Sequence, residues 1–134
     1  MTRMLFVGFF SKDIERLCRF YADLFGFPEI ADGRNEIFRS LDCGSIRLCF
    51  HGNAAYDLLG LGDHAKHTGV QQAITFDAAS TRDLDEKMAR AQSLGATLVK
   101  GPFITYYKHY QVVFFDPDGN VFRITVPTTD PNPS

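Results

Sequence analysis

The sequence contains no tryptophan, only three cysteines and no long apolar run. Cys18, Cys43 and Cys49 are odd in number and lack paired spacing, so they predict no disulfide framework, and a reducing compartment suits them better. No stretch approaches the roughly 20 apolar residues of a membrane span, and Met4–Phe10 is too short for a signal peptide. We therefore expect a cytoplasmic protein.

The sequence also lacks a strong charge of either sign. The net charge is −2, and the basic residues are scattered along the chain. This balance provides no positive field for nucleic acid or for an acidic membrane surface, so neither is expected as a partner. With 134 residues, of which 45% are hydrophobic, the chain suits a single globular domain spanning residues 1–134.

The first part of the chain, about residues 4–51, predicts the element order β, α, β, β, β. Ser11 or Asp13 can cap a helix whose apolar stripe ends at Phe25, and Gly26 supplies the left-handed residue that ends helices. The turn pairs Asp32-Gly33 and Cys43-Gly44 separate the strands that follow it. The expected strands are Met4–Phe10, Glu29–Ala31, Glu36–Leu41 and Ser45–His51.

The same order recurs over about residues 70–127. Between the two parts lies a Gly-rich connector, residues 52–69, with a short helix expected at Ala55–Leu59. Ser80 and Asp83 resemble a capping box, and Gly95 ends the helix that it starts. Residues 128–134 are polar and are expected to form a loose tail. The expected strands of this part are Val70–Asp77, Ala96–Val99, Tyr110–Phe115 and Val121–Val126.

Two segments carry a family resemblance. Phe20–Phe27 resembles the helix end Phe-Tyr-x-x-x-Leu-Gly-Phe of the vicinal-oxygen-chelate superfamily, which includes glyoxalases, bleomycin-resistance proteins and ring-cleaving dioxygenases. Asp116–Asn120 resembles the last hairpin of that family, and Gly101-Pro102-Phe103 stands where the family often has Gly-Pro. The resemblance covers about residues 4–127.

The resemblance implies an α+β fold in which two βαβββ modules form a curled mixed sheet. The helices would cover the convex face, and a ligand would sit in the concave cavity. Members of the family commonly form dimers, so the resemblance also implies a homodimer. Because side chains alternate between the two faces of a strand, Phe6, Phe10, Arg47, Cys49, Gln71 and Arg123 would face this cavity.

Family enzymes usually place one metal ligand, His, Gln or Glu, on each of four cavity strands. Carried over by position, these places hold Phe6, Cys49, Gln71 and Arg123. Phenylalanine has no lone pair to donate, and arginine offers no acceptor. Gln71 and Cys49 alone do not make a site for zinc or a hard cation. The sequence thus predicts no metal and no other cofactor.

Several cavity residues have two competing interpretations. Arg47 and Arg123 either bind a carboxylate or phosphate or pair with local acids such as Glu36 and Asp42. Cys49 beside Arg47 is either a nucleophile with a lowered pKa or an inert buried thiol. The aromatic residues either stack on a ligand or pack in the core or a dimer interface; they are Phe6, Phe10, Tyr106, Tyr107 and Tyr110.

The histidines are weaker candidates. His51 and His109 could act as general bases, although an exposed histidine near a strand end is the simpler interpretation. His64 and His67 have helical spacing, yet the surrounding connector favours a linker over a metal site. No catalytic residue is therefore identified.

We expect the protein to bind a small molecule without a metal, and we expect that molecule to be anionic and partly apolar. The first alternative is a superfamily enzyme, a lyase, isomerase or dioxygenase, whose metal site is atypical or absent. The second is an interaction module whose sheet supports a dimer. The sequence names neither the ligand nor a reaction.

Overall fold

The computed structural model describes residues 1–65, 69–70 and 72–128. The chain divides into two compact units, Met1–Gly69 and Val70–Ser134, and each is described by itself. The boundary coincides with the start of the predicted second module. His67, Gln71 and most of the predicted tail lie outside the described residues.

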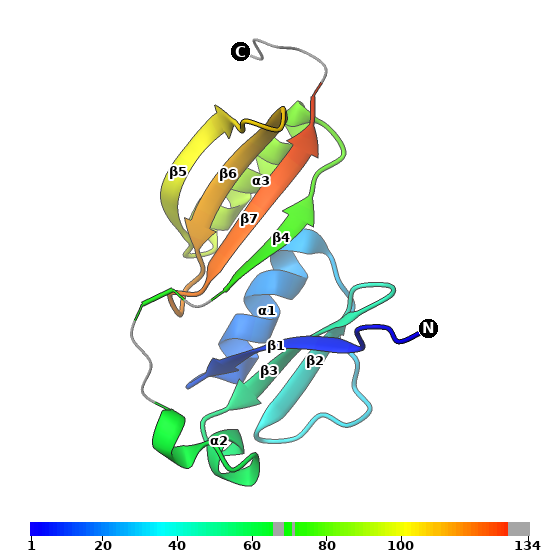
Figure 1. Cartoon of the computed structure of the whole chain (residues 1–134), viewed down its shortest axis with the longest axis vertical. Coiled ribbons are helices and arrows are strands. Elements are labelled where there is room, and N and C mark those ends of the chain that lie inside the picture. The colour runs from blue at the N-terminus through cyan, green and yellow to red at the C-terminus, as the bar shows by residue number, and fades with distance from the viewer. Residues whose placement is uncertain (66–68, 71, 129–134) are drawn as a thin grey trace. The chain divides into compact units, whose positions relative to one another are not determined.

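The first unit contains a three-stranded sheet with strand order β1-β3-β2, and α1 lies behind this sheet in Figure 1. Strand β1 runs parallel to β3, and β2 runs antiparallel to β3. The elements are β1 (Phe6–Ser11), α1 (Ile14–Phe25), β2 (Phe38–Asp42), β3 (Arg47–Gly52), α2 (Ala55–Leu58) and the 3-10 helix η1 (Gly62–His64).

Helix α1 begins and ends where the sequence predicts. The Asp13 side chain accepts a hydrogen bond from the backbone N–H of Arg16, and Gly26 has φ 77°, the left-handed conformation that closes a helix. Leu17 and Tyr21 are completely buried against the sheet side of the helix. The predicted apolar stripe is therefore the face that packs.

The predicted strand Glu29–Ala31 is reduced to a single bridge between Glu29 and Leu41. Its backbone still follows β2, because the N–H of Ile30 donates to the carbonyl of Ser40. Pro28 has no N–H to contribute to a longer ladder. This segment completes the β-α-β-β-β order as a short, irregular strand.

The second unit repeats the arrangement with a four-stranded sheet of order β4-β7-β6-β5, with α3 behind it in Figure 1. Strands β4 and β7 are parallel, and the other pairs are antiparallel. The elements are β4 (Ala73–Asp77), α3 (Thr81–Ser93), β5 (Thr97–Ile104), β6 (His109–Phe115) and β7 (Val121–Pro127). Strand β5 continues well beyond the predicted Ala96–Val99.

The cap of α3 differs in detail from the predicted capping box. Ser80 Oγ accepts from the N–H of Asp83 as expected. The Asp83 carboxylate, however, accepts from the N–H of Ala79, one residue before the cap. Both free donors are still satisfied, so the helix start is fixed as the sequence implies.

Strand alternation confirms which face of each sheet packs on its helix. In the first unit Leu48 and Phe50 are buried, and in the second Phe122 and Ile124 are completely buried. Their neighbours in sequence, including Arg47 and Arg123, therefore point to the opposite face. We call these opposite faces the open face of each unit. No helix in the described part of the chain is long and apolar enough to cross a membrane.

Candidate binding faces of the two units

Arg123 lies on the open face of the second unit. Its Nε donates a hydrogen bond to Oγ1 of Thr75 at 2.9 Å. Thr75 and Arg123 are direct partners on the parallel strands β4 and β7. This bond orients the guanidinium across the sheet and leaves its terminal nitrogens available to another acceptor.

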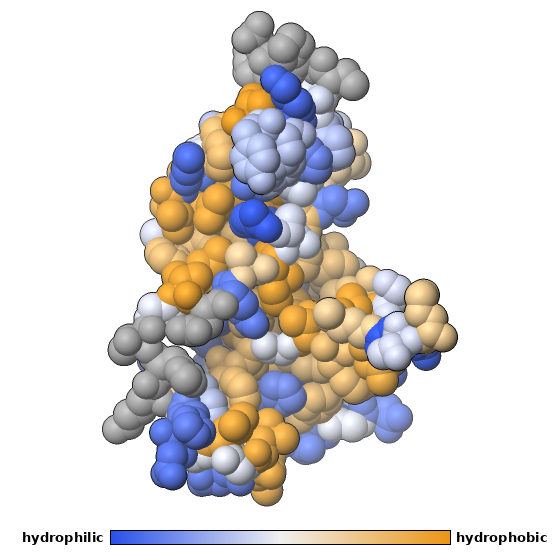
Figure 2. Space-filling view, in the orientation of Figure 1, coloured by the Kyte–Doolittle hydropathy of each residue, from blue (hydrophilic) through white to orange (hydrophobic). Residues whose placement is uncertain are grey.

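The same face carries polar and aromatic groups in the rows beyond Arg123. The Tyr107 hydroxyl donates to Oε1 of Gln111 at 2.9 Å, and Gln111 is 4% exposed. Nδ1 of His109 shares a hydrogen bond of 3.0 Å with Oγ1 of Thr125. The rings of Tyr107 and His109 meet edge to face at 4.8 Å. In Figure 2 this unit displays hydrophilic groups set among apolar ones.

No carboxylate of the described residues forms an ion pair with Arg123 or Arg47. The structure shows no ion pair of these arginines with Glu36 or Asp42, the alternative interpretation, although Asp42 is the direct partner of Arg47 on β2 and lines the same hollow. Arg123, which no carboxylate of the described residues pairs with, is therefore the more favourable place for an anion.

The open face of the first unit brings Phe6 and Arg47 together. They are direct partners on β1 and β3, and the Arg47 guanidinium carbon lies 5.7 Å from the centre of the Phe6 ring. Arg3, Phe6 and Arg47 also line a hollow of about 490 Å³ at this end of the sheet. Cys49 lies two residues beyond Arg47 in β3, opposite Gly8. A larger hollow of about 630 Å³ contains none of the predicted site residues.

Cys49 is not an activated nucleophile. Burial raises the pKa of its thiol, and the opposing effect of Arg47 is smaller. The side chain is 1% exposed. Of the two interpretations of Cys49, the inert buried thiol is the one this environment favours, because loss of solvent outweighs one nearby cation. Its cross-strand partner Ser40 is equally buried, and the Ser40 hydroxyl has no hydrogen-bond partner among the described residues.

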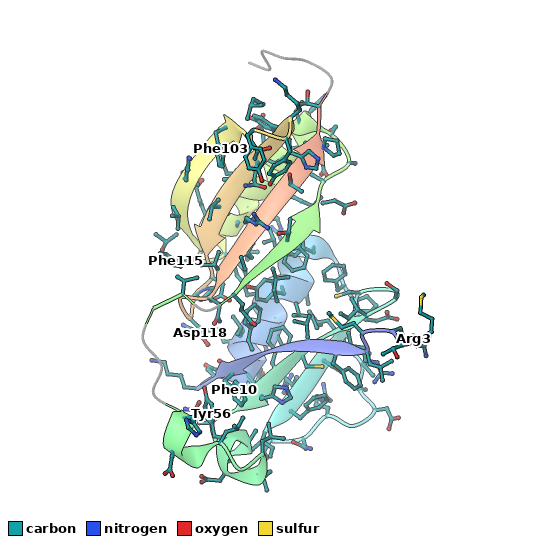
Figure 3. All side chains as sticks on the ribbon, in the orientation of Figure 1. Arg3, Phe10, Tyr56, Phe103, Phe115 and Asp118 are labelled. Atoms are coloured by element: carbon teal, nitrogen blue, oxygen red, sulfur yellow. The ribbon has the colours of Figure 1, made fainter. Side chains whose placement is uncertain are left out.

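His51 lies in a row of aromatic rings. Its ring centre is 5.4 Å from that of Phe10 and 5.5 Å from that of Phe38. Phe10 in turn stacks on Tyr56 of α2 at 3.9 Å, a pair labelled in Figure 3. Burial lowers the pKa of His51. Gly8 leaves room for this ring, because a Cβ at Gly8 would lie 2.9 Å from Nε2 of His51.

Two of the tyrosines that could stack on a ligand, Tyr106 and Tyr110, do not line the open face. Tyr106 is 94% exposed and meets Tyr107 edge to face. Tyr110 does not face the open side. Its hydroxyl donates to Asp85 of α3 at 2.7 Å, and burial, together with this bond, raises the pKa of Tyr110 to about 12. Tyr110 directly follows His109 in β6, so strand alternation turns its side chain to the opposite face, where α3 packs. His64 lies exposed in η1.

The donor atoms present do not fit the metal of the family enzymes. Of the four places, Phe6 provides no donor, Arg123 is a cation bound to Thr75, and Cys49 is a buried thiol. The fourth, Gln71, lies outside the described residues. Within the described part, no three His, Cys, Asp or Glu side chains cluster as a metal site requires.

Lys100 is a residue of the open face that sequence reasoning missed. The predicted strand stopped at Val99, whereas β5 continues with register shifts on both sides of Lys100. These shifts pair Lys100 with Val113, a residue of the open face, and its amine lies 4.2 Å from the centre of the Phe103 ring. The pair Gly101-Pro102, which disfavours a regular central strand, was the available signal.

Comparison with known proteins agrees with this architecture. The model of the Glyoxalase/Bleomycin resistance protein/Dioxygenase superfamily matches residues 3–124, so the chain belongs to this superfamily. A family enzyme from Burkholderia phytofirmans PsJN is 39% identical, with a TM-score of 0.88 over 90% of this chain and 94% of that chain. The predicted α+β fold of two βαβββ modules is confirmed.

More distant solved structures share the fold alone. A lactoylglutathione lyase from Agrobacterium tumefaciens is 19% identical, with a TM-score of 0.69 and 93% of each chain covered. A fosfomycin resistance protein from Listeria monocytogenes is 14% identical, with a TM-score of 0.71, covering 98% of this chain and 96% of that chain. No curated protein matches the chain.

Proposed function

We propose that this protein binds a small, anionic and partly apolar molecule without the help of a metal ion. The observation that carries the proposal is Arg123, which is oriented by Thr75 and neutralised by no carboxylate of the described residues. A guanidinium in this state gains more from an oxyanion than a paired one does, because no existing partner must be displaced.

The neighbouring residues support the same class of ligand. Tyr107, His109 and Gln111 offer ring edges and hydrogen-bonding groups on the same face as Arg123, with Gln111 in the next row. On the first unit, Arg47 and Phe6 combine a second cation with an exposed ring. Both faces thus join a cationic fork to apolar surface, which suits an anion with an apolar or aromatic part.

The test is a thermal-shift screen with a panel of aliphatic and aromatic carboxylates, because a ligand that binds only the folded state raises the melting temperature. Affinities of the hits are then measured for Arg123→Ala and Arg47→Ala. A charge-assisted hydrogen bond is worth roughly 1.5–3 kcal/mol, so each loss should weaken binding about tenfold to a hundredfold.

Arg82→Ala is the matched control, because Arg82 is an exposed arginine of α3 that pairs with Glu86. It should leave the affinity unchanged. If Arg123→Ala and Arg47→Ala keep the parental melting temperature and bind equally tightly, both arginines are structural and the proposal is wrong.

Metal content is a separate prediction. The purified protein should carry no stoichiometric zinc, iron, nickel or manganese, because Phe6 and Arg123, neither of which can donate a lone pair, occupy two of the four ligand places. Elemental analysis checks this. One metal per chain that disappears on changing Gln71 would contradict it.

The alternative function is a superfamily enzyme that works without the usual metal set. Its support is the 39% identical neighbour, which is described as a family enzyme. His109, hydrogen-bonded to Thr125, is the histidine on the same face as Arg123 and is the candidate base. Conversion of a bound carboxylate by the metal-free protein, abolished by His109→Gln, would favour this alternative over simple binding.

A further inference from the structure

The open face of the second unit carries a second cation in line with Arg123. Lys100 pairs with Val113, Val113 pairs with Arg123, and Arg123 pairs with Thr75. Direct partners on neighbouring strands share a face, so these four side chains form one row across the four-stranded sheet. The row has a cation on β5, an apolar residue on β6 and a cation on β7.

The two cationic groups point to different places. Nε of Arg123 is bonded to Thr75, so its guanidinium is directed toward β4. The Lys100 amine lies over the Phe103 ring, at the β5 side of the sheet, where Figure 3 labels Phe103. Neighbouring strands are about 4.8 Å apart, so the backbones of β5 and β7 are about 10 Å apart. One compact anion would not satisfy both groups in these orientations.

Lys100, like Arg123, forms no ion pair with any carboxylate of residues that the structure describes. The next row of the face consists of Phe103, Gln111, Thr125 and Asp77. Its acid, Asp77, lies on β4, at the far edge of the sheet from Lys100. The β5 side is therefore positive and apolar, with no acid of this row to compensate Lys100.

We propose that the ligand carries two separate anionic groups joined by an apolar segment, one held by Arg123 and the other by Lys100. The inference rests on the proposed function, since it adds a second anion to the one at Arg123. Val113 and the edge of Phe103 would contact the apolar segment. Either carboxylates or phosphates provide the oxyanion that both cations recognise.

The test compares dicarboxylates with monocarboxylates of equal length, suberate with octanoate and adipate with hexanoate. We expect calorimetry to show that a dicarboxylate binds at least tenfold more tightly than its monocarboxylate, which is about 1.4 kcal/mol. Lys100→Met keeps an apolar chain over Phe103 and removes the charge. It should abolish this preference and leave the monocarboxylate affinity unchanged, whereas Arg123→Ala should weaken both classes.

Lys12→Met is the control, because Lys12 is an exposed lysine of the first unit. Equal affinity for both classes, or a dicarboxylate affinity that Lys100→Met does not change, would overturn the second anion and leave binding at Arg123 intact. Inorganic phosphate and methylphosphonate are compact anions. If Lys100→Met and Arg123→Ala each weaken the binding of one of them, a single anion contacts both cations, and the separation of the two anionic groups is wrong. Binding of none of these probes would overturn both proposals.

Discussion

At the scale of single residues, burial decides what the ionisable groups of this protein can do. Cys49, Cys18 and His51 lie near charged or polar groups in the sequence, yet desolvation is the largest cause of each pKa shift. Each is thereby held in its neutral form. The arginines behave differently, because guanidinium remains charged in any protein environment. The sequence could identify which residues bear charge, and burial determines which of them keep it.

His51 should make stability depend on pH. Burial places the pKa of His51 below the ordinary value of 6.5, so the unfolded chain takes up a proton at a higher pH than the folded protein. The free energy of unfolding should therefore fall as the pH drops below about 6.5, until the folded form is protonated too. Urea unfolding at a series of pH values measures this effect.

The variant His51→Gln should flatten that dependence, since it removes the titrating group. His64→Gln, which changes an exposed histidine of η1, should leave the slope unchanged. An equally steep pH dependence in His51→Gln would show that another group is responsible.

Asp116 is the residue on which the last hairpin depends. It is 3% exposed and accepts from the backbone N–H groups of Asp118 and Asn120 at 2.8 and 3.0 Å. Asp116→Ala leaves these donors without their acceptor and should lower the free energy of unfolding by about 2–3 kcal/mol. Asp116→Asn, which keeps one acceptor oxygen, should cost less. Chemical denaturation of both variants checks this, and equal losses would contradict the role of the carboxylate as acceptor.

At the scale of helices and strands, local signals in the sequence predict the structure well where one signal dominates. Asp13 and Gly26 bracket α1, and the alternation in β7 correctly separates Phe122 and Ile124 from Arg123. Prediction fails where backbone geometry departs from strict alternation. The register shifts in β5 turn Lys100 to the open face, and no pattern of apolar residues records such a shift. Of the two cations in the row that joins Lys100 to Arg123, the sequence could therefore predict only Arg123.

At the scale of the whole molecule, the edges of the sheets bear on whether the chain forms a dimer. Strand β1 is an edge strand of its sheet and pairs there with β3. Met4 and Leu5, just before β1, and Phe6, its first residue, are 68%, 53% and 53% exposed. Exposed edges that carry large apolar side chains are normally covered, because they otherwise recruit other chains. We therefore propose that the protein is a homodimer.

Light scattering should give twice the chain mass at micromolar concentration. Leu5→Lys places a charge beside the edge of β1, where burial in an interface would cost the desolvation of an ammonium group, so this variant should shift the mass toward the monomer. Leu58→Lys is the matched control, because it adds the same charge at an exposed leucine of α2. Circular dichroism must show both variants folded. A monomer mass for the parent across the micromolar range would refute the dimer, and equal dissociation by Leu5→Lys and Leu58→Lys would mean that added charge rather than the β1 edge controls assembly.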